Sequence, residues 1–155
     1  MTIRSPRLIT AVICFTFTIP SIAQEKKIAR SSLPAAVEKT VQEQSKGATI
    51  KGFSTEVEKG KRVYEAEMIV DGHTKDIEIA SDGTLNEIEE EVSFDSLPQN
   101  VKAGLTMKAA GAKITKVETL TKKGKLVAYE AATLKGTKKG EIQVGPDGQS
   151  LKHEE

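Results

Sequence analysis

Apolar residues recur every four positions in two stretches of the chain. The first series is Leu33, Val37 and Val41, and the second is Leu97, Val101 and Leu105. This spacing places the apolar side chains along one face of an α-helix, where they can pack against another element. The pattern therefore predicts two amphipathic helices, separated by about sixty residues.

Both predicted helices begin with the same phrase, Ser-Leu-Pro-x-x-Val. Ser32 and Ser96 are the expected N-caps, because a serine hydroxyl can accept a hydrogen bond from the first free backbone N–H groups. Pro34 and Pro98 fall in the first turn, where a missing N–H costs nothing. The expected helix ends are Gly47 and Gly111.

Alternation of apolar and polar residues follows each predicted helix and indicates β-strands. It is clearest at Phe53, Thr55 and Val57, at Tyr64, Ala66, Met68 and Val70, at Ile77 and Ile79, and at Tyr129, Ala131 and Thr133. Turns are expected at Lys59-Gly60, Asp71-Gly72, Asp82-Gly83 and Lys123-Gly124. Each half is therefore expected to be one helix followed by about four antiparallel strands.

The landmarks of the first half return in the same order in the second half. The phrases Lys-Gly-Lys, Tyr-Glu-Ala and Asp-Gly all reappear, at an offset of 64 residues that becomes 65 after an extra residue near Ala128. Such ordered correspondence predicts an internal duplication, with repeats at 31–92 and 95–155. A sixty-residue unit is marginal alone, so we expect an α+β fold in which the two sheets are packed or joined into one body.

The first 23 residues have the layout of a secretory signal peptide. Arg4 and Arg7 precede an apolar run from Leu8 to Ile19, and small residues lead to a cleavage site after Ala23. An uncleaved membrane anchor is the alternative. Cleavage would remove Cys14, the single cysteine, and would leave an exported chain, periplasmic or secreted, with no stable membrane insertion.

Charge is unevenly divided between the two predicted repeats. Residues 32–91 hold 7 basic and 14 acidic side chains, whereas residues 96–155 hold 11 basic and 6 acidic ones. The chain as a whole is near neutral, which argues against nucleic acid as the main partner. The opposite charges could help the halves dock, could present two faces to a partner, or could be solvated surface charge without a role.

The residue types that carry catalysis or bind metals are scarce. Neither His73 nor His153 lies in a recognisable ligand or triad pattern, and no phosphate-binding or nucleophile motif occurs. The acidic run Glu87–Glu91 could attract Ca²⁺, but solvated charge that protects a strand edge is the favoured interpretation. Lysines near the expected hairpins could meet an anionic partner or serve solubility; they are Lys122, Lys123, Lys125, Lys135, Lys138 and Lys139. We therefore predict no catalytic or metal site and no cofactor.

The Leu-Pro-x-x-Val helix starts, the Tyr-Glu-Ala strands and the turns at Asp82 and Asp147 resemble the PepSY-like tandem domains of exported bacterial proteins. The resemblance covers about residues 31–155. It implies a fold similar to that of β-lactamase inhibitory protein, and a role in binding or restraining secreted peptidases. It brings no catalytic residues and does not imply inhibition of a β-lactamase.

These observations lead to two hypotheses for function. The first is a non-catalytic module that binds or restrains an extracytoplasmic protein, such as a hydrolase or peptidase, through residues still unknown. The second is a carrier of a small apolar ligand held between helix and sheet, in a cavity lined by Met68, Met107 and β-branched residues. Tyr64 and Tyr129 are expected in the core, as are Phe53 and Phe94 unless they seal the junction between the halves.

Overall fold

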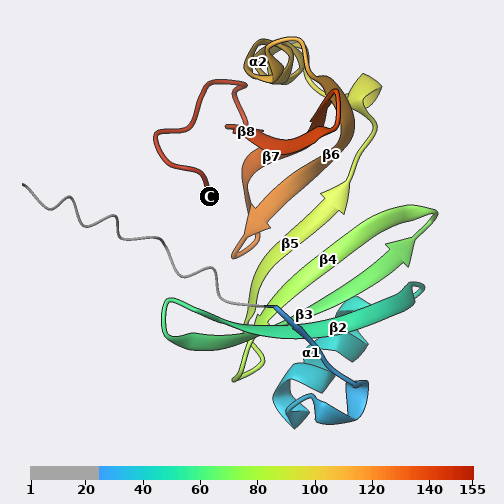
Figure 1. The fold of residues 1–155 in the computed structure, drawn as a ribbon. Helices are drawn as coiled ribbons and strands as arrows, with labels where there is room; N and C mark the ends of the chain where they lie inside the picture. The colour runs from blue at the N-terminus through green and yellow to red at the C-terminus, as the bar shows by residue number, and fades with distance from the viewer. Residues whose placement is uncertain (1–24) are drawn as a thin grey trace, which may run out of the picture.

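The computed structural model describes residues 25–155 (Figure 1). The first half contains β1 (Lys26–Lys27), a 3₁₀ turn (Arg30–Ser32), α1 (Ala35–Gln44), β2 (Thr49–Glu58), β3 (Lys61–Val70), β4 (His73–Ala80) and β5 (Leu85–Glu91). The second half contains a 3₁₀ turn (Phe94–Ser96), α2 (Gln99–Ala109), β6 (Lys113–Lys122), β7 (Lys125–Lys135) and β8 (Lys138–Val144). The predicted signal peptide lies outside the described residues.

All eight strands belong to one antiparallel sheet, in which each strand pairs with its neighbours in chain order from β1 to β8. The predicted α+β tandem of two helix-plus-four-strand repeats is therefore wrong: the described chain is mostly β, with two α-helices and a single sheet. The halves are continuous because Glu87–Glu91 of β5 pair with Glu118–Lys122 of β6. That residues 31–92 and 95–155 arose by duplication of one ancestral segment stays a prediction.

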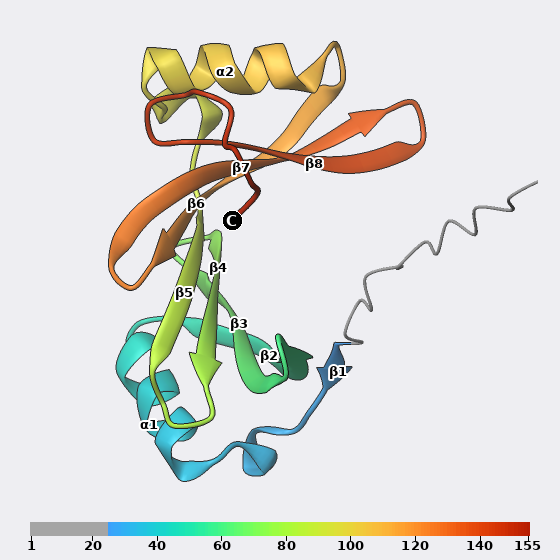
Figure 2. The same cartoon turned by 90° about the vertical axis from the view of Figure 1, so that its left-hand side faces the viewer.

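The second half stops one strand short of the predicted four. After β8 the chain enters Gly145-Pro146-Asp147-Gly148, where Gly145 and Gly148 are joined by a turn hydrogen bond of 2.8 Å. Pro146 has no N–H to donate, so the segment cannot continue a ladder there. The chain after Gly148 forms no strand and runs back across β8 (Figure 2).

Both helices begin one residue after a proline rather than at the predicted serine caps. Pro34 and Pro98 occupy the N-cap positions, with extended backbone, and neither serine caps the helix. Ser32 ends a 3₁₀ turn, and the Ser96 hydroxyl donates to the Ser93 carbonyl at 2.7 Å. The prolines decide the start because the residue before a proline disfavours helical backbone.

Each helix covers a hydrophobic core of its own on the same face of the sheet. Val37 and Val41 of α1 pack with Met68, Ile77 and Ile79, all of them buried. Under α2 the buried set is Leu97, Val101, Leu105, Val117, Ala131 and Val144. Phe53 and Tyr64 belong to the first cluster, and Phe94 and Tyr129 to the second, so the two phenylalanines do not form a common seal.

The strand register accounts for the residue that the second half has gained. Leu120 pairs with Ala128 and Thr121 with Leu126, so Val127 is an extra residue in a β-bulge. This is the place, near Ala128, where the sequence comparison predicts an added residue. Within residues 25–155, none of the helices has the length and apolar content needed to cross a bilayer.

Candidate binding surface

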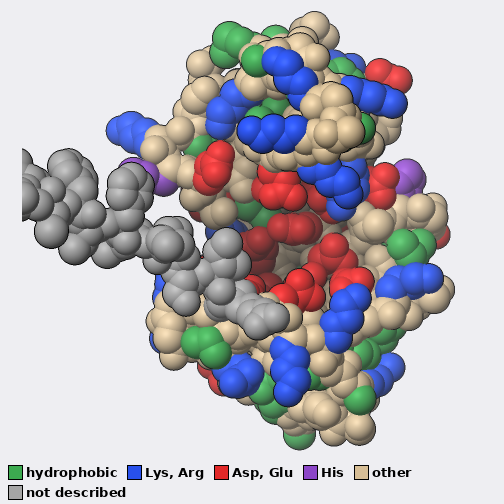
Figure 3. All heavy atoms as spheres, viewed as in Figure 1, with side chains coloured by type: hydrophobic (Ala, Val, Ile, Leu, Met, Phe, Trp, Pro, Cys, Tyr) green, Lys and Arg blue, Asp and Glu red, His purple; other side chains and the backbone are tan. Residues whose placement is uncertain are grey.

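The face of the sheet opposite the helices is hollow and lined by acidic side chains. In the strands that bury Ala66, Ile77 and Ile79 toward α1, the alternate residues point the other way, because successive side chains of a strand lie on opposite faces. Those alternate residues are mostly Glu and Asp. Figure 3 shows their carboxylates gathered in the hollow between the two halves of the molecule. We call this surface the acidic face.

The strand pairing aligns the acidic face in rows that cross the sheet. One row runs Ser54, Glu65, Glu78, Glu87, Lys122 and Lys125, and the next runs Gly52, Glu67, Asp76, Glu89, Leu120 and Ala128. A third row holds Glu91, Glu118, Glu130 and Gln143. Carboxylates that stand directly opposite one another on neighbouring strands repel. The acidic face therefore concentrates negative charge along β3, β4 and β5. Its first row ends at lysines on β6 and β7, whereas its third row extends the carboxyls onto those two strands.

A cavity of about 190 Å³ opens in the part of the acidic face formed by the first half. It is lined by ten residues of β2 to β5: Ser54, Thr55, Glu56, Val63, Glu65, Asp76, Ile77, Glu78, Glu87 and Glu89. A wider hollow of about 550 Å³ lies over β6 to β8, where Lys116 and Lys139 accompany Glu118, Glu130 and Glu141 beside Ala132 and Leu134. The two hollows differ in charge: the first offers carboxylates, whereas the second offers both signs.

Partial burial and mutual repulsion disfavour the charged form of several of these carboxyls. Burial, with the nearby Asp76 carboxylate next in importance, raises the pKa of Glu65 to about 7. Burial and the charge of Glu118 raise the pKa of Glu89 to about 8. Burial also raises the pKa of Asp76, Glu78 and Glu130 above the usual range. The acidic face consequently takes up protons near neutral pH, which ordinary surface carboxylates do not do.

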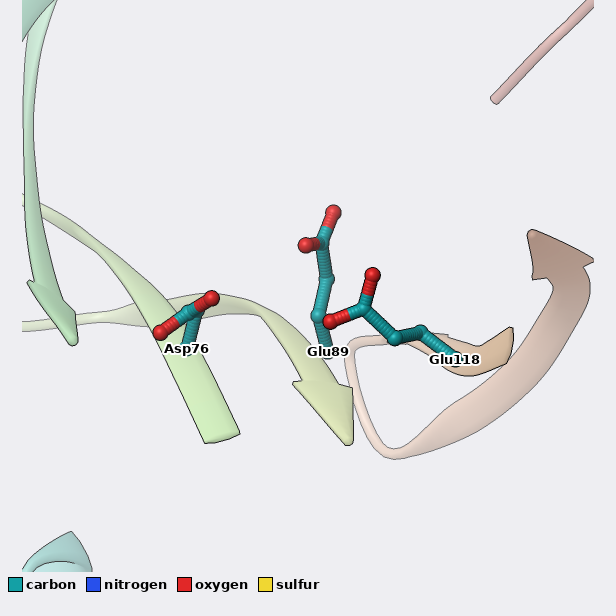
Figure 4. A group of neighbouring side chains, drawn as sticks. All are labelled: Asp76, Glu89 and Glu118. Atoms are coloured by element: carbon teal, nitrogen blue, oxygen red, sulfur yellow. The ribbon is translucent and has the colours of Figure 1, made fainter. Parts of the chain in front are cut away.

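The closest acidic group lies at the seam between the halves. Asp76 of β4, Glu89 of β5 and Glu118 of β6 each offer a carboxylate oxygen, and these oxygens lie within 4.8 Å of one another (Figure 4). Oxygen donors of this type suit Ca²⁺ or Mg²⁺. Lys116 already pairs with Glu118 at 2.7 Å, and its ammonium supplies positive charge at the same place. These three carboxylates are the residues best placed to hold a cation.

The structure corrects the interpretation of the acidic run Glu87–Glu91. This run forms β5, which pairs on both sides with β4 and β6, so it does not protect a sheet edge. Glu87, Glu89 and Glu91 belong to the acidic face, whereas Glu90 points to the helix side and pairs with Lys75 at 2.8 Å. Sequence reasoning singled out this run but missed Glu65, Glu67, Asp76 and Glu78. Their signal was the strict alternation in Tyr64-Glu-Ala and Ile77-Glu-Ile.

The other candidates from the sequence are not brought together. His73 and His153 are exposed, and neither belongs to the close acidic group. The hairpin lysines divide between the β6–β7 turn and the β7–β8 turn, at opposite ends of β7; of them, Lys122 pairs with Glu87 at 3.2 Å. Met68 is buried under α1, but Met107 is 73% exposed on α2 in the other half, so the two methionines do not line a shared cavity.

Comparison with known proteins relates this fold to bacterial structures. A BLIP-like protein from Bacteroides fragilis superposes with a TM-score of 0.57 at 21% identity, over 77% of this chain and 83% of that one. A DUF2874 family protein from Bacteroides ovatus gives 0.60 at 18% identity, over 78% and 86%. A protein from Bacteroides eggerthii, inferred to be periplasmic, gives 0.63 at 15% identity, over 77% and 86%.

At these identities the likeness concerns the fold alone. No family model and no curated protein matches the chain. The fold of this protein is therefore similar to that of BLIP-like and DUF2874 family proteins of Bacteroides. The resemblance to PepSY-like domains stays a prediction from the sequence motifs.

Proposed function

We propose that this protein is a non-catalytic binding module of the bacterial periplasm, and that the acidic face holds a lysine- or arginine-bearing segment of a partner protein. The observation that carries the proposal is the charge of a sheet face that neither helix covers. Nine carboxyls occupy its central rows: Glu65, Glu67, Asp76, Glu78, Glu87, Glu89, Glu91, Glu118 and Glu130. On the same face, Lys116 pairs with Glu118 and Lys122 pairs with Glu87, so lysines of this face pair with two of the nine.

Such a face lowers the stability of the free protein. Carboxyls with raised pKa values are those whose charged form the fold disfavours, through burial and like-charge repulsion. The cationic groups of a partner would relieve the repulsion and restore ordinary pKa values, so part of this cost returns as binding free energy. Perturbed titratable groups gathered in a hollow are typical of functional sites. A partner that is itself acidic would be repelled.

The comparisons agree with a binding role without identifying the partner. One structural neighbour is described as BLIP-like, a name taken from an inhibitory protein that acts on β-lactamases, and another is inferred to be periplasmic. The predicted signal peptide and the PepSY-like motifs point the same way. A secreted hydrolase or peptidase with a basic surface loop is the kind of partner that we propose.

Site-specific photocrosslinking in the periplasm of the source cells tests this proposal. A photoreactive residue at Glu56 or Glu87, which both line the cavity of the acidic face, samples that face, and one at Glu43, which is exposed on α1, samples the helix side. We expect a defined protein adduct from the two acidic-face positions and none from Glu43. Adducts that form only from Glu43, or equally from all three positions, would contradict the proposal.

A defined probe separates charge from other effects. A ten-residue peptide of alternating lysine and glycine is titrated by calorimetry at pH 9, above the pKa values of about 7 for Glu65 and about 8 for Glu89, with a glutamate–glycine peptide as the negative control. The variant E65Q/E89Q removes two carboxylates of the acidic face, and E43Q/E90Q removes the same charge elsewhere. We expect the first variant to bind the lysine peptide at least about fivefold more weakly than the second. Equal affinities would overturn the role of the acidic face.

A further inference from the structure

The segment Gln149–Glu155, which we call the C-terminal strap, crosses from the helix side of β8 onto the acidic face. It starts at a turn in which Gly145 donates to the Gln149 carbonyl at 2.8 Å, and Leu151 lies close to Gly145. Figures 1 and 2 show the strap leaving the end of β8 and ending in front of the sheet, between the two halves. The strap therefore occupies space on the surface assigned above to the partner.

Two contacts fix the end of the strap to the acidic face. The backbone N–H of Glu155 donates to Oε1 of Gln143 at 2.8 Å, and Gln143 in turn donates to the Glu130 carboxylate at 2.6 Å. The Glu155 carboxylate lies 3.8 Å from the ammonium of Lys122, which also pairs with Glu87. Farther back, the Glu154 carboxylate is 4.0 Å from the Lys108 ammonium of α2. These contacts are few, polar and mostly at the surface.

The register shows what lies beneath the strap. Gln143 stands in the row of Glu118 and Glu130, and Lys122 stands four residues beyond Glu118 along β6. The row between them holds Leu120 and Ala128, which are 2% and 0% exposed although they lie on the face without a helix. Glu155 contacts both flanking rows, through Gln143 and Lys122, so the end of the strap spans the row that holds this pair.

We propose that the C-terminal strap is an autoinhibitory contact, which shields Leu120, Ala128 and Lys122 until a partner displaces it. Surface ion pairs and single hydrogen bonds each contribute little to stability, so a segment held by so few of them opens readily while the sheet stays folded. Displacement exposes an apolar patch beside the carboxylates, and a partner would then find both an anchor for an apolar side chain and sites for its cations. The competition, though not the opening itself, rests on the function proposed above.

Opening of the strap can be measured without any partner. The predicted mature chain contains no cysteine, so an introduced thiol is unique. A128C places a thiol beneath the strap, and A131C places one on the same strand beneath α2; both positions are 0% exposed. We expect a maleimide to label A128C at least about tenfold faster than A131C, because only local opening is needed. Adding E155K, which brings like charges together at Lys122, should accelerate labelling of A128C alone.

Two results of this experiment would contradict the proposal that the strap covers Ala128 and opens. One is labelling of A128C at the rate of A131C, and the other is an E155K variant that leaves the A128C rate unchanged. If A128C fails to fold, L120C replaces it, because Leu120 pairs with Ala128 in the same row and is 2% exposed. Its labelling rate is then compared with that of A131C, with and without E155K, and the same two results would contradict the proposal.

A disulfide lock tests whether the strap competes with the partner. The double variant Q143C/E155C is compared with itself, oxidised and reduced, for binding of the lysine–glycine peptide. We expect the oxidised form to bind at least about fivefold more weakly, since a locked strap cannot leave the face. Equal binding by both forms would refute the competition and leave the acidic face as a binding site. If neither form nor the parent chain binds the peptide, the proposed function fails, and the labelling rates still decide whether the strap opens.

Discussion

The two faces of this single sheet are built from the same strands and differ in almost every physical respect. In β4, Ile77 and Ile79 are buried against the core below α1, whereas Asp76 and Glu78, their immediate neighbours, line the acidic face. The helix face is apolar and buried. The opposite face carries carboxyls whose pKa values are raised by burial and mutual repulsion.

This difference separates the origin of stability from the origin of function. Burial of apolar side chains is the main favourable contribution to folding, and here it comes from the helix face. The acidic face opposes folding when its groups are charged, yet the fold tolerates it because the two helix-covered cores suffice. A face that lowers stability and is nevertheless densely populated with one type of charge is the reason for proposing a ligand of the opposite charge.

The largest effect should follow from breaking the helix face. I79A removes three methyl or methylene groups from a side chain that is 0% exposed, and we expect the free energy of unfolding to fall by about 2–5 kcal/mol. The neighbouring substitution E78Q lies on the acidic face, and we expect it to change the free energy of unfolding by less than about 0.5 kcal/mol at pH 5. Denaturation in urea, followed by circular dichroism, measures both. A loss of comparable size in E78Q would show that the acidic face also supports the fold.

A smaller effect, of the opposite sign, should follow from removing one charge of the acidic face. Burial and Glu118 raise the pKa of Glu89 to about 8 in the folded protein, above the usual value of 4.5. For a carboxyl raised in this way, the folded state binds the proton more tightly than the unfolded state. Its contribution to stability is therefore complete below about pH 4.5 and is lost as the pH rises to about 8.

E89Q should accordingly be more stable than the natural chain above pH 8, by about 1–2 kcal/mol. This free energy is smaller than the one calculated from the whole pKa shift, because solvent reaches part of the carboxylate. Below pH 4.5 the two chains should differ little. The matched control is E90Q, which removes the adjacent carboxylate from the helix side, where it pairs with Lys75. We expect E90Q to lose about 0.5 kcal/mol near neutral pH. A destabilised E89Q at pH 9 would contradict this account of the acidic face.

Local features of the fold follow from the sequence, but its global class does not. The four-residue spacing at Val37 and Val101 predicts both helices, and alternation at Ile77 and Ile79 predicts the strand and its buried face. The helix starts shift from the serines to the prolines by local backbone sterics. The joining of the halves into one sheet depends on long-range pairing of Glu89 with Leu120, which no local pattern reports.

Only part of the candidate site could be predicted from the sequence. The run Glu87–Glu91 stands out as a charge cluster, but its meaning depends on whether β5 lies inside the sheet or at its edge. Glu65 and Asp76 come together with Glu89 only through the register of β3, β4 and β5. Alternation alone shows that these residues share a face; it does not show that the face is hollow or that burial shifts their pKa values.

The smallest effect expected from the contrast between the faces is a dependence of stability on salt. Mobile ions screen repulsion between carboxylates on the open face, whereas they have little access to the cores on the helix face. At pH 9, raising sodium chloride from 20 to 500 mM should therefore increase the free energy of unfolding, by about 0.5–1 kcal/mol. At pH 5, where Glu65 and Glu89 are protonated, the increase should be smaller, since their folded pKa values are about 7 and about 8.

Parallel urea titrations of the natural chain and of E65Q/E89Q measure this salt dependence. The variant should lose most of the increase at pH 9; a natural chain that salt destabilises at that pH would mean that attraction, through pairs such as Lys122 with Glu87, outweighs repulsion on this face.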